Sequence, residues 1–298
     1  SFIGVAAQFS AAEGNFEPWA IKHAIRFTVL LVVMLIIALI DIKIIYKYAY
    51  YIFFITLCLL FSVEIIGTFG KGAERWIRIF GISIQPSEII KIGIILSLAK
   101  FYHKLRFDNI GNIIYLFLPL LIILLPFFLV LIQPDLGTSL SILLLGVTIM
   151  FIAGVKIWKF LLGITLTLIS LPFFWNNIKP YQQKRILSFL NPESDPLGQG
   201  YQLIQSKIAL GSGGLTGKGF LKGTQSYLEY LPEKQTDFIF TLIGEEFGFI
   251  GTIFILFLFF LIILICFYIS VKSYHIFGRI ISLGIASNLF IYVLLNMS

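Results

Sequence analysis

Long apolar stretches alternate with short polar links along most of this chain. Each stretch approaches the length of about 20 residues that an α-helix needs to cross a hydrocarbon core about 30 Å thick. The pattern therefore predicts an all-α fold, namely a polytopic bundle of transmembrane helices. The expected helices cover residues 25–40, 50–66, 113–131, 136–153 and 160–175, together with one that begins at Pro86 and one that begins near residue 280.

The apolar stretch over residues 238–271 is too long for one straight span. At about 1.5 Å per residue it would extend for about 50 Å. We expect a bend or break at Gly244, Gly248 or Gly251. The first residues resemble the last part of a hydrophobic helix, and the sequence stops inside an apolar run. We therefore expect further parts of the outermost helices beyond both ends.

Residues 176–237 form the one long polar segment, which we expect to be a large loop outside the membrane. Loops of this length inside a compact fold are uncommon and are usually functional. The remaining links are short, so we expect one membrane domain over residues 1–298. This loop would be its main extramembrane part.

Basic residues predict the orientation of the helices. The links at residues 41–47, 100–108, 154–159 and 272–279 are rich in Lys and Arg, so by the positive-inside rule they face the cytoplasm. The links at residues 13–23, 67–85 and 133–135 then face outward together with the long loop. These outward links also contain some cations, which weakens the asymmetry.

Composition excludes several classes of protein. Only 12% of residues are charged and 58% are hydrophobic, whereas soluble domains have about 25% charged residues. The net charge of +7 is spread over the links, which argues against a nucleic-acid partner. Cys58 and Cys266 lie in apolar runs, where packing is the simplest role. The chain has no metal-binding spacing of His and Cys, no Walker motif and no dinucleotide fingerprint.

Asp237 is the first candidate for catalysis, because it lies where an apolar helix begins at the membrane edge. A general base at this position could take a proton from a substrate hydroxyl. The alternative is a structural N-cap, which Asp performs well. Glu245 and Glu246 follow about 12–13 Å deeper along the helix. Ionisable groups at such depth are usually paired or functional, and we favour pairing or support of the loop.

Other candidates lie on the outward links. Glu88 and Lys91 are three residues apart on one helix face, so they would either pair or line an outward cavity with Asp135. Arg75 and Arg185 could hold phosphate oxygens, or they could be solvated surface charges. Trp76 is either an interfacial belt residue or an aromatic platform for a sugar or lipid stem. Substrate contacts are further expected from the polar cluster Thr224, Gln225 and Ser226, and from Glu233.

Several of these residues lie in motifs that resemble those of one family. The segments GAERWI, IQPSEIIKIG, IQPDLGTSL, RILSFLNPESDPLGQGYQ and SGGLTGKGFLKGTQSYLEYLPEKQTDFIFTLIGEEFGFIG are similar to those of the SEDS family, and within it to the branch that serves cell elongation. The similarity covers nearly the whole chain from about residue 18 to residue 249. Both the order of the motifs and the lengths of the links fit.

The resemblance implies a fold of about ten helices in the cytoplasmic membrane of a bacterium. It also implies that the protein polymerises lipid II at the outer face of that membrane. The family's essential acid falls on Asp237, its outward Trp on Trp76, and two further acids of its polar outward cavity on Glu88 and Asp135. Where the family usually has His before Thr-Asp, this chain has Gln235, which disfavours a mechanism that needs an imidazole there.

The implied reaction is an inverting glycosyl transfer with undecaprenyl pyrophosphate as the leaving group. Arg75, Arg185 or a divalent cation such as Mg²⁺ or Mn²⁺ would stabilise that leaving group. The expected partners are lipid II, a class B penicillin-binding protein, other membrane proteins of the elongation complex, and membrane lipid. The alternatives are a lipid II flippase and a scaffold that activates the penicillin-binding protein.

Overall fold

The computed structural model describes residues 2–17, 19–66, 68–70, 73–79, 82–133, 135–177, 199–223 and 238–297, and the single residues 183, 187 and 236. The chain groups into two compact units. Unit 1 contains residues 1–40 and 178–260, and unit 2 contains residues 41–177 and 261–296. Most of the segment 176–237 lies outside the described residues, so one membrane domain with a large loop stays a prediction.

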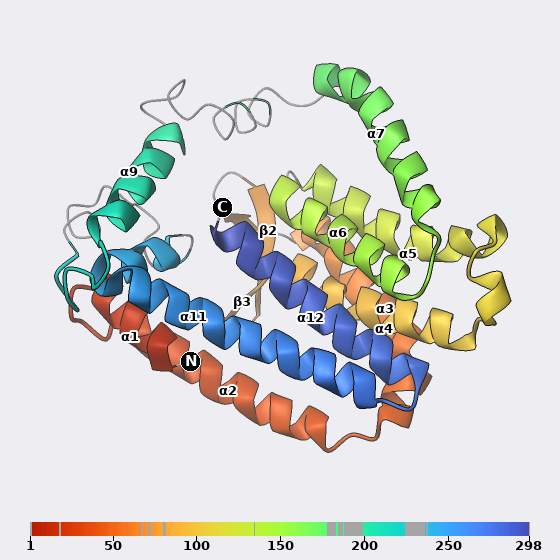
Figure 1. The fold of residues 1–298 in the computed structure, drawn as a ribbon, viewed down its shortest axis with the longest axis horizontal. Helices are drawn as coiled ribbons and strands as arrows, with labels where there is room; N and C mark the ends of the chain where they lie inside the picture. Colours follow the sequence, from red (N-terminus) through yellow and green to blue (C-terminus); the bar gives the residue numbers. More distant parts are fainter. Residues whose placement is uncertain are drawn as a thin grey trace. The chain divides into compact units, whose positions relative to one another are not determined.

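The described residues are nearly all helical, as the sequence predicts (Figure 1). Five helices, α2, α3, α5, α11 and α12, are long and apolar enough to cross a membrane. The helices are α1 (Phe2–Ala11), α2 (Ala20–Ala38), α3 (Ile42–Ile66), α4 (Pro86–Lys104), α5 (Ile113–Ile132), α6 (Leu136–Ile152), α7 (Ile157–Asn177), α9 (Gln199–Ser212), α11 (Ile239–Lys272) and α12 (Ile276–Met297), with a 3₁₀ turn η1 (Phe107–Asn109).

Two helices differ from the prediction. α3 begins at Ile42 and not near residue 50, because the side chain of Asp41 accepts a hydrogen bond from the backbone N–H of Lys43 at 2.9 Å and caps the helix. The link that was expected at residues 41–47 is therefore helical. In addition, α9 forms within the long polar segment, where the sequence predicts only a loop.

The interior of unit 2 is built around α4, which packs against α3, α5 and α6. Ile90, Ile94 and Leu98 have no exposed surface. Lys91 and Lys100 on the same helix are also buried, at 3% and 7% exposure. Because other helices surround α4, these charges face protein, as intramembrane charges generally do. The helix with two buried lysines is thus packed among its neighbours in the interior of unit 2.

Close helix contact in unit 2 depends on a small residue at the α5–α6 interface. A Cβ atom on Gly146 of α6 would lie 2.5 Å from Cγ1 of Ile123 on α5. Because glycine has no side chain, the two helices can approach each other at this position. Ile123, at 1% exposure, fills the space instead.

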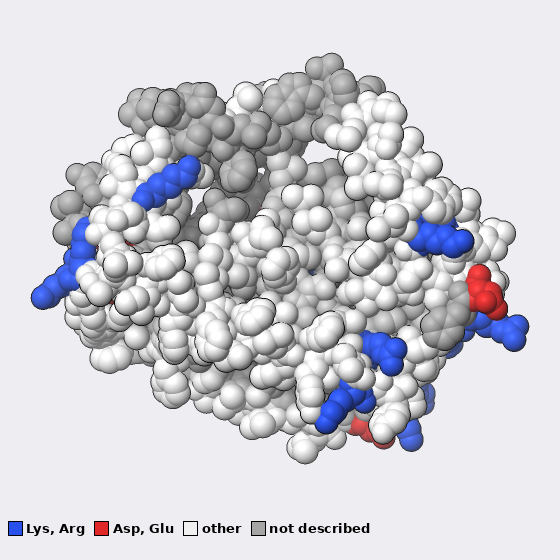
Figure 2. Space-filling model, viewed as in Figure 1, with Lys and Arg blue, Asp and Glu red and all other residues white. Residues whose placement is uncertain are grey.

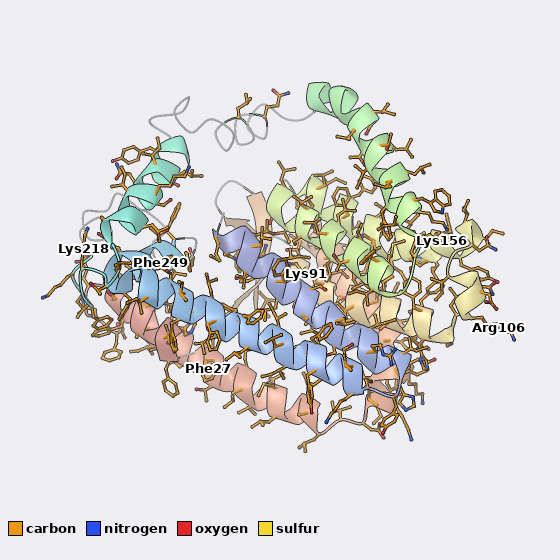
Figure 3. The ribbon with its side chains drawn as sticks, viewed as in Figure 1. Phe27, Lys91, Arg106, Lys156, Lys218 and Phe249 are labelled. Carbon is orange, nitrogen blue, oxygen red and sulfur yellow. The ribbon has the colours of Figure 1, made fainter. Side chains whose placement is uncertain are left out.

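The basic links meet at one end of unit 2. The ammonium group of Lys100 donates a hydrogen bond to the carbonyl oxygen of Lys47 at 2.8 Å. The rings of His103 and His275 lie 6.5 Å apart, and Lys159 donates to the carbonyl oxygen of Gly111 at 2.6 Å. Lys and Arg side chains gather at this end in Figure 2, and Figure 3 labels Arg106 and Lys156 there. The arrangement agrees with the predicted grouping of these links on one side of the membrane.

A small sheet follows α3 and was not predicted. β1 (Thr68–Gly70), β2 (Ala73–Ile79) and β3 (Ile82–Ile84) form an antiparallel sheet in the order β1-β2-β3. Thr68 pairs with Trp76, and Ile77 pairs with Ile84. The sheet leads directly into Pro86, which lies in the first turn of α4 as predicted.

Unit 1 contains α1, α2, α9, residues 213–223 and α11 as far as residue 260. Its small core joins Ala7 and Ala11 of α1 to Leu242 and Ile243 of α11. Trp19 packs against this core from the segment that precedes α2. The core fixes the first turns of α11, which begin two residues after Asp237.

Candidate active site

The structure describes only part of the predicted site. Trp76, Glu88, Lys91 and Asp135 are described, and Arg75 is described as part of strand β2 but not as a side chain. The other predicted residues stay untested. The residues outside the described part of the chain are Asp237, Arg185, Thr224, Gln225, Ser226 and Glu233.

Glu88 and Lys91 form an ion pair near the N-terminus of α4. The Lys91 Nζ atom lies 2.8 Å from Oε1 of Glu88. The Lys91 side chain is 4% exposed, whereas that of Glu88 is 41% exposed. The pair therefore has a buried cation and an acid that reaches the surface. Pairing was one of the two roles expected for these residues, and their role in an outward cavity stays a prediction.

Asp135 caps α6. Its Oδ1 atom accepts a hydrogen bond from the backbone N–H of Thr138 at 3.2 Å, and its Oδ2 atom accepts one from the hydroxyl of Thr138 at 3.0 Å. The side-chain amide of Gln85 lies 3.4 Å from the same Oδ2. Because Gln85 directly precedes Pro86, this contact brings the N-termini of α4 and α6 together. Both predicted acids of this region thus lie at neighbouring helix ends.

Gln133 contributes a further polar contact at this end of unit 2. Its side-chain amide donates to the carbonyl oxygen of Leu60 on α3 at 3.2 Å, and the residue is 7% exposed. Neither Gln85 nor Gln133 was among the predicted site residues. Each directly precedes a proline in one of the motifs quoted from the sequence, and that position is the signal that could have identified it. Trp76 is 38% exposed on β2, compatible with either an interfacial position or a contact to substrate.

α11 is broken at Gly248, one of the three glycines at which a break was expected. Gly248 has φ +65° and ψ −162°, a backbone conformation that favours glycine. Residues 213–219 lie against this break. The N–H groups of Lys218 and Gly219 donate to the carbonyl oxygens of Glu245 and Glu246 at 3.0 and 2.9 Å.

The same segment also receives hydrogen bonds from the second part of α11. The N–H groups of Phe249 and Ile250 donate to the carbonyl oxygens of Gly214 and Leu215 at 2.9 and 3.1 Å. We call the contact between residues 213–219 and 244–250 the interlock. It supplies partners to backbone groups that the break takes out of the helix. Figure 3 shows Lys218 and Phe249 on these two neighbouring segments.

The two buried acids of α11 are paired within unit 1. Glu245 has no exposed surface, and its Oε1 atom lies 2.8 Å from Nζ of Lys218 in the interlock. Glu246 is 1% exposed and accepts a hydrogen bond from the hydroxyl of Ser10 on α1. The structure thus supports the expected pairing of these acids. Neither Lys218 nor Ser10 was predicted as a partner, since they lie 27 and 236 positions away.

The break also bears on how deep the two acids lie in the membrane. Residues 249–272 follow the break, and at about 1.5 Å per residue this part of α11 extends for about 36 Å. It can therefore cross the hydrocarbon core by itself. Glu245 and Glu246 precede the break, so a span over residues 249–272 does not need to include them, and their depth in the membrane stays a prediction.

A divalent cation finds no cluster of protein ligands within the described ranges. No group of three or more His, Cys, Asp and Glu side chains there could hold a metal ion. The candidate acids Asp237 and Glu233 fall outside those ranges. The Mg²⁺ or Mn²⁺ ion therefore stays a prediction.

Known proteins that resemble this chain point to one family. Residues 4–298 match the FtsW/RodA/SpoVE family of cell cycle proteins. The chain is 41% identical to the peptidoglycan glycosyltransferase MrdB of Escherichia coli K12 over 257 residues, 84% of this chain and 67% of MrdB. It is 38% identical to a probable peptidoglycan glycosyltransferase FtsW of Trichlorobacter lovleyi over 308 residues, 99% of this chain and 80% of the relative.

Solved structures agree with this assignment. A chain of a peptidoglycan synthase complex is similar with a TM-score of 0.82 and 26% identity, covering 99% of this chain and 83% of that one. The crystal structure of the rod shape determining protein RodA of Thermus thermophilus has the same fold, with a TM-score of 0.71, 23% identity and coverage of 99% and 80%. The apolar helices, the order of the motifs and these matches together show that the chain is a multi-pass membrane protein of the FtsW/RodA/SpoVE family, the SEDS family.

Proposed function

We propose that this chain is a peptidoglycan glycosyltransferase that polymerises lipid II, with Asp237 as the general base. The enzyme class is supported by relatives that are named peptidoglycan glycosyltransferases, and most strongly by the 41% identity to MrdB over 84% of the chain. We place the reaction at the outer face of the membrane, because the basic links gather at the other end of the helices of unit 2 and the positive-inside rule assigns that end to the cytoplasm.

The reaction we propose is a direct displacement at the anomeric carbon of the donor sugar. The 4-hydroxyl of the acceptor's terminal GlcNAc attacks C1 of a lipid-linked MurNAc and inverts it. Asp237 takes the hydroxyl proton, the new glycosidic bond forms, and the bond from C1 to the pyrophosphate oxygen breaks. Undecaprenyl pyrophosphate leaves with the electron pair. General-base catalysis supplies about 10²–10⁴-fold to such a step.

Described residues supply candidate contacts to the lipid-linked substrate. Lys91 is a buried cation at the end of α4 that meets the N-terminus of α6. To bind the pyrophosphate, Lys91 would exchange its Glu88 partner for a phosphate oxygen, and the low local dielectric constant would strengthen that contact. Trp76 exposes a ring on β2 that could carry a sugar or a lipid stem. Arg75 and Arg185 remain candidates for the pyrophosphate.

We further propose that a class B penicillin-binding protein is the partner. A structural relative with 26% identity comes from a peptidoglycan synthase complex that coordinates polymerisation and crosslinking. A transpeptidase beside the polymerase would crosslink the glycan that this chain makes. The polymerase activity of this chain should rise when the penicillin-binding protein is added to the purified protein.

The decisive experiment is lipid II polymerisation by the purified protein in detergent, where no membrane sides exist. We expect glycan from the wild type and a loss of about 10²-fold or more for Asp237→Asn. Asp108→Asn is the matched control, because Asp108 is exposed in η1 at the basic end. A folded Asp237→Asn protein with wild-type synthesis would refute the assignment of the base.

The same experiment separates the alternatives. A flippase moves lipid II without polymerising it, so purified wild-type protein would make no glycan in detergent. A scaffold would make none alone and would increase crosslinking by the penicillin-binding protein equally well with Asp237→Asn. Either result would replace the polymerase proposal.

A further inference from the structure

The interlock has a side-chain contact that the proposed chemistry does not use. Lys218 and Glu245 form an ion pair at 2.8 Å, with a Glu245 side chain that has no exposed surface and a Lys218 side chain that is 26% exposed. We infer that Lys218 and Glu245 are positioning residues for the glycosyl transfer, an inference that rests on the proposed role of Asp237. They would hold the start of α11, and with it the candidate base, in one place.

Glu245 contacts chain on both sides of the segment that contains the candidate base. A Cβ atom on Gly223 would lie 3.1 Å from Oε2 of Glu245 and 3.6 Å from Cγ of Glu246, so the backbone there rests on these two acids. Gly223 directly precedes the Thr224 cluster. On the other side, Glu245 belongs to α11 itself, eight positions after Asp237. Glu245 thus contacts the residue that precedes residues 224–237, and it belongs to the helix that follows them.

The backbone of the interlock leaves little freedom around this pair. A Cβ atom on Gly213 would lie 2.0 Å from the carbonyl oxygen of Gly244, and one on Gly217 would lie 2.0 Å from that of Glu246. The two segments therefore touch backbone to backbone. Four backbone hydrogen bonds cross the same contact.

A positioning role explains the ion pair better than stability alone. Buried ion pairs are weak contributors to stability, and well-packed apolar residues often replace them without loss. What an ion pair adds is a defined geometry. Glu245 is joined to the start of α11 by six residues of helix, which transmit its position rigidly to the turn next to Asp237. Displacing a catalytic group by about 1 Å can cost about 10²-fold in rate.

The test compares variants of the full-length chain in the lipid II polymerisation assay, with the partner protein present. We expect Lys218→Met to lower kcat by about 10- to 100-fold, with KM for lipid II unchanged within about twofold. Lys218→Arg should recover most of the activity, because it keeps the charge and the reach. Lys222→Met is the matched control on the same segment, where an exposed Lys is replaced in the same way, and it should behave as wild type.

A second pair of measurements separates position from folding. The double variant Lys218→Met, Glu245→Gln removes both charges, so it should unfold close to the wild-type temperature and yet keep the low kcat. Wild-type kcat in Lys218→Met or in the double variant would overturn the inference, as would a loss of kcat matched by a loss of folded protein that Arg does not reverse. These results leave the proposed function standing as long as Asp237→Asn is inactive. An active Asp237→Asn variant would overturn both.

Discussion

Replacing Gly217 by Ala would test the interlock directly. Gly217 has φ +82°, where a side chain is unfavourable. The new Cβ atom would lie 2.0 Å from the carbonyl oxygen of Glu246 and 2.6 Å from Cα of Phe247. Both atoms belong to backbone, so no rotation of a side chain can relieve the contact. Residues 213–219 must therefore move away from α11.

These contacts give the loss in free energy of unfolding that we expect for Gly217→Ala. A positive φ costs Ala about 1–2 kcal/mol. Moving the segment also lengthens the hydrogen bonds from the N–H groups of Lys218 and Gly219 to α11, and each net loss costs about 1 kcal/mol. The sum is about 3–4 kcal/mol. That is a large fraction of the free energy of unfolding of a typical domain.

The measurement is the free energy of unfolding in mixed detergent micelles, followed by circular dichroism. Gly214→Ala is the matched control, because Gly214 has φ +56° but no heavy atom within 4 Å of its would-be Cβ atom. The free energy of unfolding of Gly214→Ala should fall only by the cost of a positive φ, about 1–2 kcal/mol. Equal losses for the two variants would show that residues 213–219 do not rest on α11, and the account of the interlock would be wrong.

Three further predictions concern unit 2. Gly146→Ala should destabilise the α5–α6 contact by about 1–3 kcal/mol, measured by the same unfolding assay, and the double variant Gly146→Ala, Ile123→Ala should lose less than the sum of the two single losses, because Ile123→Ala removes the atoms that the new Cβ would meet. Asp135→Ala should cost about 1 kcal/mol, because α6 loses its N-cap; an unchanged unfolding free energy would contradict that role. Lys91→Met should raise KM for lipid II, whereas an unchanged KM in steady-state polymerisation would exclude Lys91 from substrate binding.

The helices could be predicted from the sequence because each is an apolar run bounded by polar residues. A break in α11 was also predictable, since a run of about 50 Å exceeds the membrane and three glycines offered places for it, although the sequence did not single out Gly248 among them. The start of α3 was missed because Asp41 and the lysines after it look like a link, although an Asp also caps helices. The small sheet was missed because an outward link rich in glycine carries little periodic signal.

The contacts that build the site could not be predicted in the same way. The need for a partner of Glu245 follows from its depth in an apolar segment, but its identity as Lys218 depends on how the chain turns at Gly214 and Gly217. Likewise, Gln85 meets Asp135 across 50 positions only because α4 and α6 begin at the same end. Pairings of this kind are set by tertiary structure and leave no local pattern.

The interlock has a consequence for how the protein is made. Its two halves are about 30 residues apart, and the second half, residues 244–250, leaves the ribosome later. Residues 213–219, which belong to the loop predicted to face outward, must therefore wait without these backbone partners until α11 has been synthesised. The contact can form only after residues 244–250 have been synthesised, so a product that stops before them would carry the earlier membrane helices without the interlock.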